Sequence, residues 1–418
     1  MGSKEKEKNE GDESETMQTR TKQYNKGRRR DICGLILQCG GLTNKGLRLY
    51  WNGESEYRNK SQAVAMLKRD GIIKEAQLTP YGARMTRMYT INETSDEFEV
   101  CIPTFPIGTL PVYKEFLKPI ENSARAKSAE DKQERAMKMV DAQTLMLIAG
   151  VNCTAIDMFN LFNPMSRQKG SSYQVEGGKN YFIPYQYQRK EWGDIITASR
   201  SIGTYLHQDK EVYHVYNFGD TRPMWQRIKE EEQWLKKTSV MVENLCPEWN
   251  VDKAIEERSR RAIVIANDKP IVDMIMEKPN EGPAKKYLVL PNLYRPGMYH
   301  IPFSEDGVKM MRLINRPHWR EYILKAVLGD AYGSAKRGTG ISHDANDGRK
   351  MTLVYCVPDV EKLRNFVINA RAYDEKENFE IICFPYQLPL IQKVAGEVCT
   401  IHIFPMDKLE GMGEKFKV

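Results

Sequence analysis

The stretch that decides the fold runs over residues 58–92 and reads RNKSQAVAMLKRDGIIKEAQLTPYGARMTRMYTIN. Its first part places Ala63, Met66 and Leu67 at the spacing of one helix face. Gly71 follows where a helix commonly ends, because glycine adopts the left-handed backbone of that position without strain. Two strand-like pieces come next, IIKEAQ and RMTRMYTIN, separated by a turn that contains proline and glycine. The stretch therefore predicts a helix followed by a two-stranded ribbon.

Two further helices are predicted upstream of this stretch. The segment RRRDICGLILQCGG ends at two glycines and carries apolar residues at helical spacing, namely Ile32, Leu35, Ile36 and Cys39. The next segment, TNKGLRLYW, begins with Thr43, whose hydroxyl can cap a short second helix. Three short helices followed by a ribbon form the pattern of a winged helix-turn-helix domain. We therefore predict such a domain over residues 28–92.

The winged-helix hypothesis assigns a use to the polar residues of the stretch. In that arrangement the third helix enters the major groove of DNA. Side chains on its leading turn would contact base edges, and these are Arg58, Lys60, Ser61 and Gln62. Basic side chains farther along would contact phosphates, and these are Lys68, Arg69, Arg84 and Arg87. The alternative is a helical hairpin domain whose charges are only solvated.

Positive charge is concentrated in the same part of the chain. The 418 residues carry a formal net charge of +7. Residues 20–92 contain 15 Lys and Arg against 5 Asp and Glu, a net charge of +10, so the remainder of the chain sums to −3. A local excess of this kind suits nucleic acid or an anionic membrane surface. The helix pattern and the charge together favour double-stranded DNA as the partner.

Composition predicts a cytoplasmic protein. The eight cysteines are scattered, never form C-x-x-C and mostly lie in apolar runs, which indicates reduced, buried thiols. No signal peptide opens the chain, and its longest uncharged apolar run is too short to span a bilayer. We therefore expect no membrane association.

The rest of the chain divides by composition. Residues 1–27 have almost no apolar content, which predicts a disordered tail, and residues 93–128 are spaced by prolines, which predicts a connector. An amphipathic helix, strand-rich stretches and a second long helix follow. The last third repeats an apolar strand, a short turn and a helix, and continuously apolar strands indicate burial on both faces. We therefore predict a mixed or parallel α/β domain over residues 129–418.

A catalytic site is the sharper hypothesis for this α/β region. Metal-dependent nucleases hold magnesium with a carboxylate that precedes an E-x-K or Q-x-K pair on adjacent strands. Asp157 lies upstream of the strand end YQYQRK, which supplies Gln188 and Lys190. Gln188 stands where an acid is usual, so an ordinary strand end is the alternative. Magnesium is expected only for the nuclease, and no histidine spacing in the chain indicates another metal.

Two other features of this region bear on nucleic-acid binding. The Gly-rich loop at 329–350 carries Lys336, Arg337, Arg349 and Lys350, which could contact phosphates. An ordinary surface loop is the simpler interpretation. The aromatic stretch YHVYNF has the character of a half-buried strand pair, on which bases could stack.

The chain also carries a run of motifs, GVNCTAIDMF, YFIPYQYQRK, SRSIGTYLHQDKEVYHVYNFGDTRPMW and EEEQW. In these motifs the sequence resembles the replication-relaxation proteins of Gram-positive plasmids and integrative conjugative elements. The resemblance covers residues 28–275. It implies an N-terminal winged helix joined to a restriction-endonuclease-like α/β domain, often without a full catalytic set. It also implies binding of element DNA.

These observations predict a DNA-binding protein of a mobile genetic element that supports plasmid replication, DNA relaxation or conjugation. Its expected partners are double-stranded DNA, replication or transfer proteins of the element, and a second copy in a homodimer that reads an inverted repeat. One alternative is a metal-dependent nuclease or nickase that uses Asp157, Gln188 and Lys190. Another is a transcriptional regulator whose large α/β region binds a partner. We expect binding rather than catalysis, because the catalytic set is incomplete.

Overall fold

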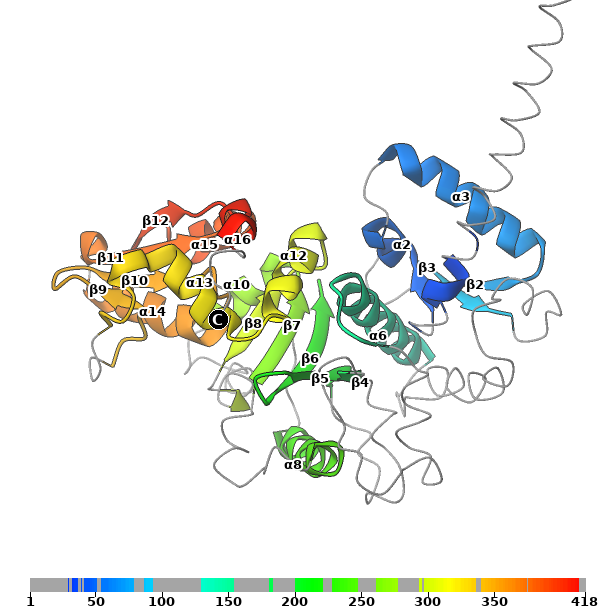
Figure 1. Ribbon diagram of the computed structural model, residues 1–418, viewed down its shortest axis with the longest axis horizontal. Helices are drawn as coiled ribbons and strands as arrows, with labels where there is room; N and C mark the ends of the chain where they lie inside the picture. The colour runs from blue at the N-terminus through cyan, green and yellow to red at the C-terminus, as the bar shows by residue number, and fades with distance from the viewer. Residues whose placement is uncertain are drawn as a thin grey trace, which may run out of the picture. The chain divides into compact units, whose positions relative to one another are not determined.

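The computed structural model describes residues 29, 32–36, 39, 41–50, 54–78, 86–92, 129–153, 180–182, 200–220, 228–246, 261–276, 293–294, 297–335, 340–373 and 375–412. Contacts divide the chain into two compact units, and each mixes helices with strands (Figure 1). The N-terminal unit comprises Met1–Thr144 with Thr154–Asn163, and the C-terminal unit comprises Leu145–Cys153 with Pro164–Val418. The described residues thus confirm the predicted α/β class.

The N-terminal unit contains a three-stranded antiparallel sheet, with two helices between its first two strands. Its elements are β1 (Leu42–Thr43), α2 (Asn44–Tyr50), α3 (Glu54–Arg69), β2 (Ile73–Leu78), β3 (Thr86–Ile91) and the first part of α6 (Ala129–Ile148). Residues 32–36, ahead of β1, are also helical. The strand order is β1-β3-β2, so the last strand lies between the other two. The helices and the ribbon that the sequence predicts are therefore present.

Short polar and glycine residues set the ends of these helices. The Thr43 hydroxyl accepts a hydrogen bond from the Gly46 amide at 2.9 Å, so Thr43 caps α2 as predicted. Gly71 ends α3 with φ = 69°, and the Ile72 amide reaches back to the Leu67 carbonyl at 2.9 Å. This left-handed ending satisfies the last carbonyls of α3 and directs the chain into β2.

Helix α6 packs closely on α2. Gly46 allows this approach, because a Cβ at that position would stand 3.3 Å from the Thr144 side chain. The Thr43 hydroxyl also donates to the Asp141 carboxylate at 2.5 Å, and Asp141 is buried. Burial raises the pKa of Asp141 to about 6. A buried carboxyl group with a raised pKa therefore joins α6 to the cap of α2.

The C-terminal unit is built on a five-stranded sheet with the strand order β4-β5-β6-β7-β8. Its strands are β4 (Tyr181–Phe182), β5 (Gly203–His207), β6 (Glu211–Gly219), β7 (Arg261–Ala266) and β8 (Met298–Ile301). The first three strands run antiparallel, and β6, β7 and β8 run parallel. The sheet is therefore mixed, as the sequence predicts.

Helices cover both faces of this sheet (Figure 1). They are α8 (Ile228–Leu245), α10 (Asp268–Met276), α12 (Glu305–Ile314) and α13 (Trp319–Leu328). Side chains alternate along β6, so Tyr213 and Tyr216 point to opposite faces. Tyr213 is hydrogen-bonded to Trp319 of α13, and Tyr216 to Glu231 of α8. No helix in the described residues is long and apolar enough to cross a lipid bilayer.

A second sheet occupies the last part of the chain, with the strand order β12-β11-β10-β9. Its strands are β9 (Ala345–Asn346), β10 (Met351–Val354), β11 (Phe379–Cys383) and β12 (Thr400–Ile403). The helices of this part are α14 (Val360–Tyr373), α15 (Leu388–Ala395) and α16 (Asp407–Met412), with short 3-10 helices at Gly329–Ala331, Lys376–Asn378 and Pro385–Gln387. Strands β10, β11 and β12 are parallel, as the strand–helix repeat predicts.

The predicted α/β region thus holds two sheets rather than one. The chain between β8 and β10 forms α12 and α13, and β10 then pairs with β9 instead of β8. The sheets meet where the His300 amide of β8 donates to the Pro358 carbonyl at 2.9 Å. One apolar core runs through both sheets.

The aromatic strand β6 differs from the half-buried strand that the sequence predicts. Residues 212–218 are all buried. β6 is the central strand of its sheet, so helices cover both of its faces and its aromatic side chains belong to the core. Bases therefore cannot stack on this strand.

Candidate nucleic-acid interface

The predicted base-contacting residues lie deeper in α3 than expected. The helix begins at Glu54, so the predicted start was wrong by about one turn. Glu54 and Glu56 explain the early start, because carboxylates stabilise the first turn of a helix. The predicted residues therefore follow the leading turn instead of forming it, and they are Arg58, Lys60, Ser61 and Gln62. Of these, only Gln62 has a side chain within the described residues.

The second half of α3 presents a polar face to solvent. Ala63, Val64 and Leu67 are buried, which fixes this half of the helix in the core. The exposed side chains are those of Gln62, Ala65, Lys68 and Arg69. Their spacing of three and four residues places them on one side of the helix. The described half of α3 thus offers one amide and two cations to a ligand.

One carboxylate on β2 holds two of the predicted phosphate contacts. Lys68 of α3 and Arg87 of β3 both pair with Glu75, and the Arg87 contact spans 3.3 Å. Glu75 lies opposite Tyr89 in the ribbon, which makes Arg87 its diagonal neighbour. The Lys68 and Arg87 side chains stay 41% and 49% exposed, whereas Glu75 is 9% exposed. Two positive charges therefore share one negative charge at the surface.

Asp70 repeats this arrangement at the end of α3. Arg69 contacts Asp70 at 3.1 Å, and Arg29 reaches it at 3.2 Å from the segment before β1. The Arg69 side chain is 72% exposed. The two carboxylates together take four cations, so this surface keeps an excess of positive charge. Arg84, the remaining predicted phosphate contact, lies outside the described residues.

Neither acidic partner of these cations, Asp70 or Glu75, was predicted from the sequence. A signal was available for Asp70, because it directly follows Arg69. Glu75 could be found only through the register of the ribbon, which places it diagonal to Arg87. Asp70 and Glu75 together pair with four cations, so the excess of positive charge that the local composition predicts is still present.

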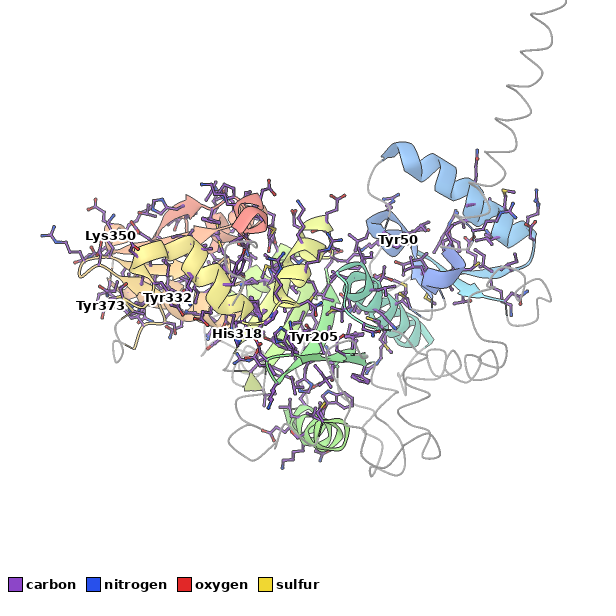
Figure 2. All side chains as sticks on the ribbon, in the orientation of Figure 1. Tyr50, Tyr205, His318, Tyr332, Lys350 and Tyr373 are labelled. Carbon is purple, nitrogen blue, oxygen red and sulfur yellow. The ribbon has the colours of Figure 1, made fainter. Side chains whose placement is uncertain are left out.

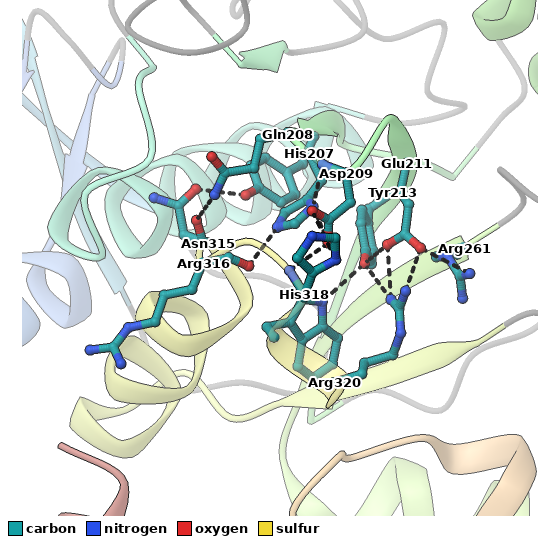
Figure 3. Close-up of polar contacts among 12 residues, drawn as sticks. His207, Gln208, Asp209, Glu211, Tyr213, Arg261, Asn315, Arg316, His318 and Arg320 are labelled. Atoms are coloured by element: carbon teal, nitrogen blue, oxygen red, sulfur yellow. Dashed lines mark hydrogen bonds and ion pairs between the residues drawn. The ribbon is translucent and has the colours of Figure 1, made fainter. Parts of the chain in front are cut away.

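A comparable set of charges gathers in the C-terminal unit, around the turn between β5 and β6 (Figure 3). Glu211 accepts a hydrogen bond from Arg320 at 2.8 Å and pairs with Arg261 at 3.0 Å. The Tyr213 hydroxyl donates to the same carboxylate at 2.5 Å and accepts from Trp319 at 3.2 Å. Burial alone would raise the pKa of Glu211, but Arg320 and Arg261 hold it below its usual range. The carboxylate therefore ties β6, β7 and α13 together.

The same turn brings together three possible metal ligands, His207, Asp209 and Glu211, whose ligand atoms lie within 4.8 Å of one another. Both ring nitrogens of His207 have partners, since the Asp209 amide donates to Nδ1 at 3.1 Å and Nε2 lies 3.1 Å from the Arg316 carbonyl. Asp209 accepts from the His318 amide at 2.8 Å. Burial lowers the pKa of His207, in keeping with a neutral ring that carries its proton on Nε2. A metal ion would have to displace these bonds, so we interpret the cluster as structural.

The nuclease hypothesis depends on residues that the structure does not describe, namely Asp157, Gln188 and Lys190. In the described part of the five-stranded sheet, the Glu211 carboxylate is neutralised by two arginines. Glu211 is therefore unsuited to replace Asp157 or Gln188 as a magnesium ligand. Cleavage stays a prediction from the sequence.

The Gly-rich loop at 329–350 is described in part. Arg349 and Lys350 are exposed, and Lys350 lies at the outside of its unit (Figure 2). Lys350 pairs with Glu380 at 2.8 Å. Lys336 and Arg337 lie outside the described residues. The described part fits an ordinary surface loop, because half of its basic charge is already paired.

The strongest candidate interface is therefore the exposed side of α3 together with the neighbouring cation of β3. Its described side chains are those of Gln62, Lys68, Arg69 and Arg87, and we refer to them as the α3 surface. It combines exposed positive charge on α3 and β3 with a neutral amide on α3. Comparison of the chain with protein-family models, with curated proteins and with solved structures found no match.

Proposed function

We propose that the N-terminal unit is a winged helix that binds double-stranded DNA through the α3 surface. The observation that carries this proposal is the order of the elements. A short strand is followed by two helices and then by two strands, in an antiparallel sheet ordered β1-β3-β2. In helix-turn-helix proteins the second helix of such a pair lies in the major groove, and α3 is that helix here.

The charges of the α3 surface support a polyanionic ligand. Lys68, Arg69 and Arg87 are all exposed, and among the described residues each pairs with a carboxylate that another cation shares. Exposed ion pairs contribute roughly 0–1 kcal/mol each, so a phosphate can replace the carboxylate at little cost. Binding would also release the counterions condensed on DNA, which makes affinity depend on salt.

Gln62 would make the sequence-specific contact with a base. Its amide side chain is exposed on α3 and carries both a donor and an acceptor. A glutamine in the major groove can pair with adenine through both atoms. Phosphate contacts carry no sequence information, so Gln62 and the cations have separable roles.

Titration of fluorescent duplex DNA with the intact chain, at two salt concentrations, tests this proposal. We expect Arg69→Ala to weaken binding to every sequence and to reduce the salt slope by about 1. Gln62→Ala should instead change which sequence is preferred. Lys325→Ala is the matched control, because Lys325 is a 45% exposed lysine on α13 in the other unit. Wild-type behaviour of both α3 variants would overturn the assignment.

We extend the proposal to the biological setting that the sequence resemblance implies. The protein would then bind DNA of a plasmid or integrative conjugative element, together with its replication or transfer proteins, and support replication, relaxation or transfer. Sequencing of the fragments that the intact chain retains from element DNA tests this extension. We expect enrichment around the origin of replication or transfer. Uniform recovery along the element would contradict it.

A further inference from the structure

Sheet edges in the described residues are protected against pairing with other chains, with one exception. Strands β1, β4 and β9 are only two residues long, and β2 carries Lys74 and Glu75. Strand β8 is covered by the segment at Pro358 and Asp359. Short, charged or covered edges are the usual means by which proteins prevent edge-to-edge association.

Strand β12 is the exception. It lies at the free end of the order β12-β11-β10-β9 (Figure 1). Its sequence, TIHI, contains no lysine, carboxylate or proline. The His402 side chain is 53% exposed and Ile403 is 51% exposed. An exposed edge without lysine, carboxylate or proline is a template for strand pairing.

The backbone of β12 faces outward at two residues. The Phe404 amide donates to the Cys383 carbonyl of β11 at 2.8 Å. Because successive residues alternate, His402 also directs its backbone groups to β11. Ile401 and Ile403 then direct their amides and carbonyls to the open side, where the described residues offer no partner. The outer edge of β12 is therefore ready to accept another strand.

We propose that this chain forms a homodimer in which β12 pairs antiparallel with β12 of a second copy. The strand is self-complementary, because Ile401 of each copy can face Ile403 of the other. Residues opposed in this way exchange both of their N–H···O bonds. In this register His402 of the two copies stand directly opposite each other, and the two four-stranded sheets join into one.

The side chains fit a second copy better than a foreign strand. Ile401 pairs in register with Ile381 of the core and lies on the same face of the sheet. In the dimer the exposed Ile403 of each copy packs beside Ile401 of the other, which extends the core over a side chain that otherwise faces water. Because β12 carries no lysine, arginine or carboxylate, it meets its own copy without a fixed like charge on the two strands, and one self-complementary patch closes a twofold dimer. The proposal does not depend on DNA binding.

Disulfide formation between copies tests the register. The intact chain with His402→Cys should form a covalent dimer under mild oxidation. Directly opposed residues that are not hydrogen-bonded have Cα atoms about 4.5 Å apart, which a disulfide can span. Ile368→Cys is the matched control, since Ile368 is 42% exposed on α14. Wild type is treated in parallel and reports any crosslink through the chain's own cysteines, of which those in the described residues are free and buried.

Light scattering after gel filtration of the intact chain tests the dimer itself. We expect wild type to be a dimer and Ile403→Lys to weaken it by at least roughly tenfold in Kd, because each lysine enters the paired edge. Ile368→Lys should leave the dimer intact. A monomeric wild type would overturn the proposal. So would a dimer that survives Ile403→Lys while His402→Cys gives no covalent product.

Discussion

Glu75 in the N-terminal unit and Glu211 in the C-terminal unit each hold two cations, but the surroundings differ. The two carboxylates are similarly buried, at 9% and 13% exposed, but the cations at Glu75 are 41% and 49% exposed, whereas those at Glu211 are 15% and 27% exposed. An exposed pair contributes little and can exchange its partner, whereas breaking a buried pair leaves an uncompensated charge. The same set of charges therefore suits ligand binding at one site and structural joining at the other. The exposure of the cations, rather than the type or burial of the carboxylate, makes the difference.

Glu211→Gln should produce the largest effect on stability. The variant keeps the size of the side chain but removes the carboxylate that Arg261 and Arg320 share, so we expect a loss on the order of 3 kcal/mol in the free energy of unfolding. Urea denaturation of the intact chain measures it. Glu321→Gln is the control, because Glu321 is 48% exposed and pairs with Lys325 on the same helix. Equal losses in the two variants would show that the Glu211 network does not hold the unit together.

Asp141 sharpens the comparison, because it is a buried carboxylate that Thr43 contacts through a neutral hydroxyl. Burial raises its pKa to about 6, while Thr43 and Lys45 act in the opposite sense. The folded protein thus binds a proton on the Asp141 carboxylate more tightly than the unfolded chain does. The stability that Asp141 contributes is therefore greatest below pH ~4 and declines as the pH rises through 6.

Asp141→Asn should remove this decline. Between pH 4.5 and 7.5 we expect the variant to gain about 2 kcal/mol relative to wild type. Urea denaturation at the two pH values measures the difference. Asp330→Asn is the control, because Asp330 is exposed beyond α13. A wild-type pH profile in Asp141→Asn would mean that the carboxyl group is not held in a raised-pKa state.

Local chemistry explains which parts of the fold the sequence predicts. The Thr43 cap and the Gly71 ending depend on neighbouring residues, so both are visible in the sequence. The first turn of α3 was missed, because its signal is the acidic pair Glu54 and Glu56 rather than an apolar period. The division into two sheets was also missed. It depends on which strands pair over long distances, and parallel strands of similar apolar composition do not specify their neighbours.

In the candidate site, too, the features that depend on neighbouring residues were predicted and those that depend on long-range contacts were not. The spacing of residues along a helix predicts which cations are exposed, and Lys68 and Arg69 were predicted in this way. Their partners depend on tertiary contacts, such as the ribbon register that brings Glu75 to Arg87. The contact between Thr43 and Asp141 joins residues 98 positions apart, and no local pattern encodes such a pair.

Glu75→Gln is the same chemical change as Glu211→Gln and should have the opposite outcome. Without the Glu75 carboxylate, Lys68 and Arg87 remain hydrated by solvent. The free energy of unfolding should therefore fall by less than ~1 kcal/mol. DNA affinity at low salt should rise by roughly three- to tenfold with a steeper salt slope, because a carboxylate no longer competes with phosphate. Titration of duplex DNA measures this, with Glu321→Gln as control. A stability loss as large as that of Glu211→Gln would refute the exposure of the cations as the deciding factor. Unchanged affinity would instead show that phosphates do not meet these two cations, and would leave Arg69 and Gln62 to account for any binding.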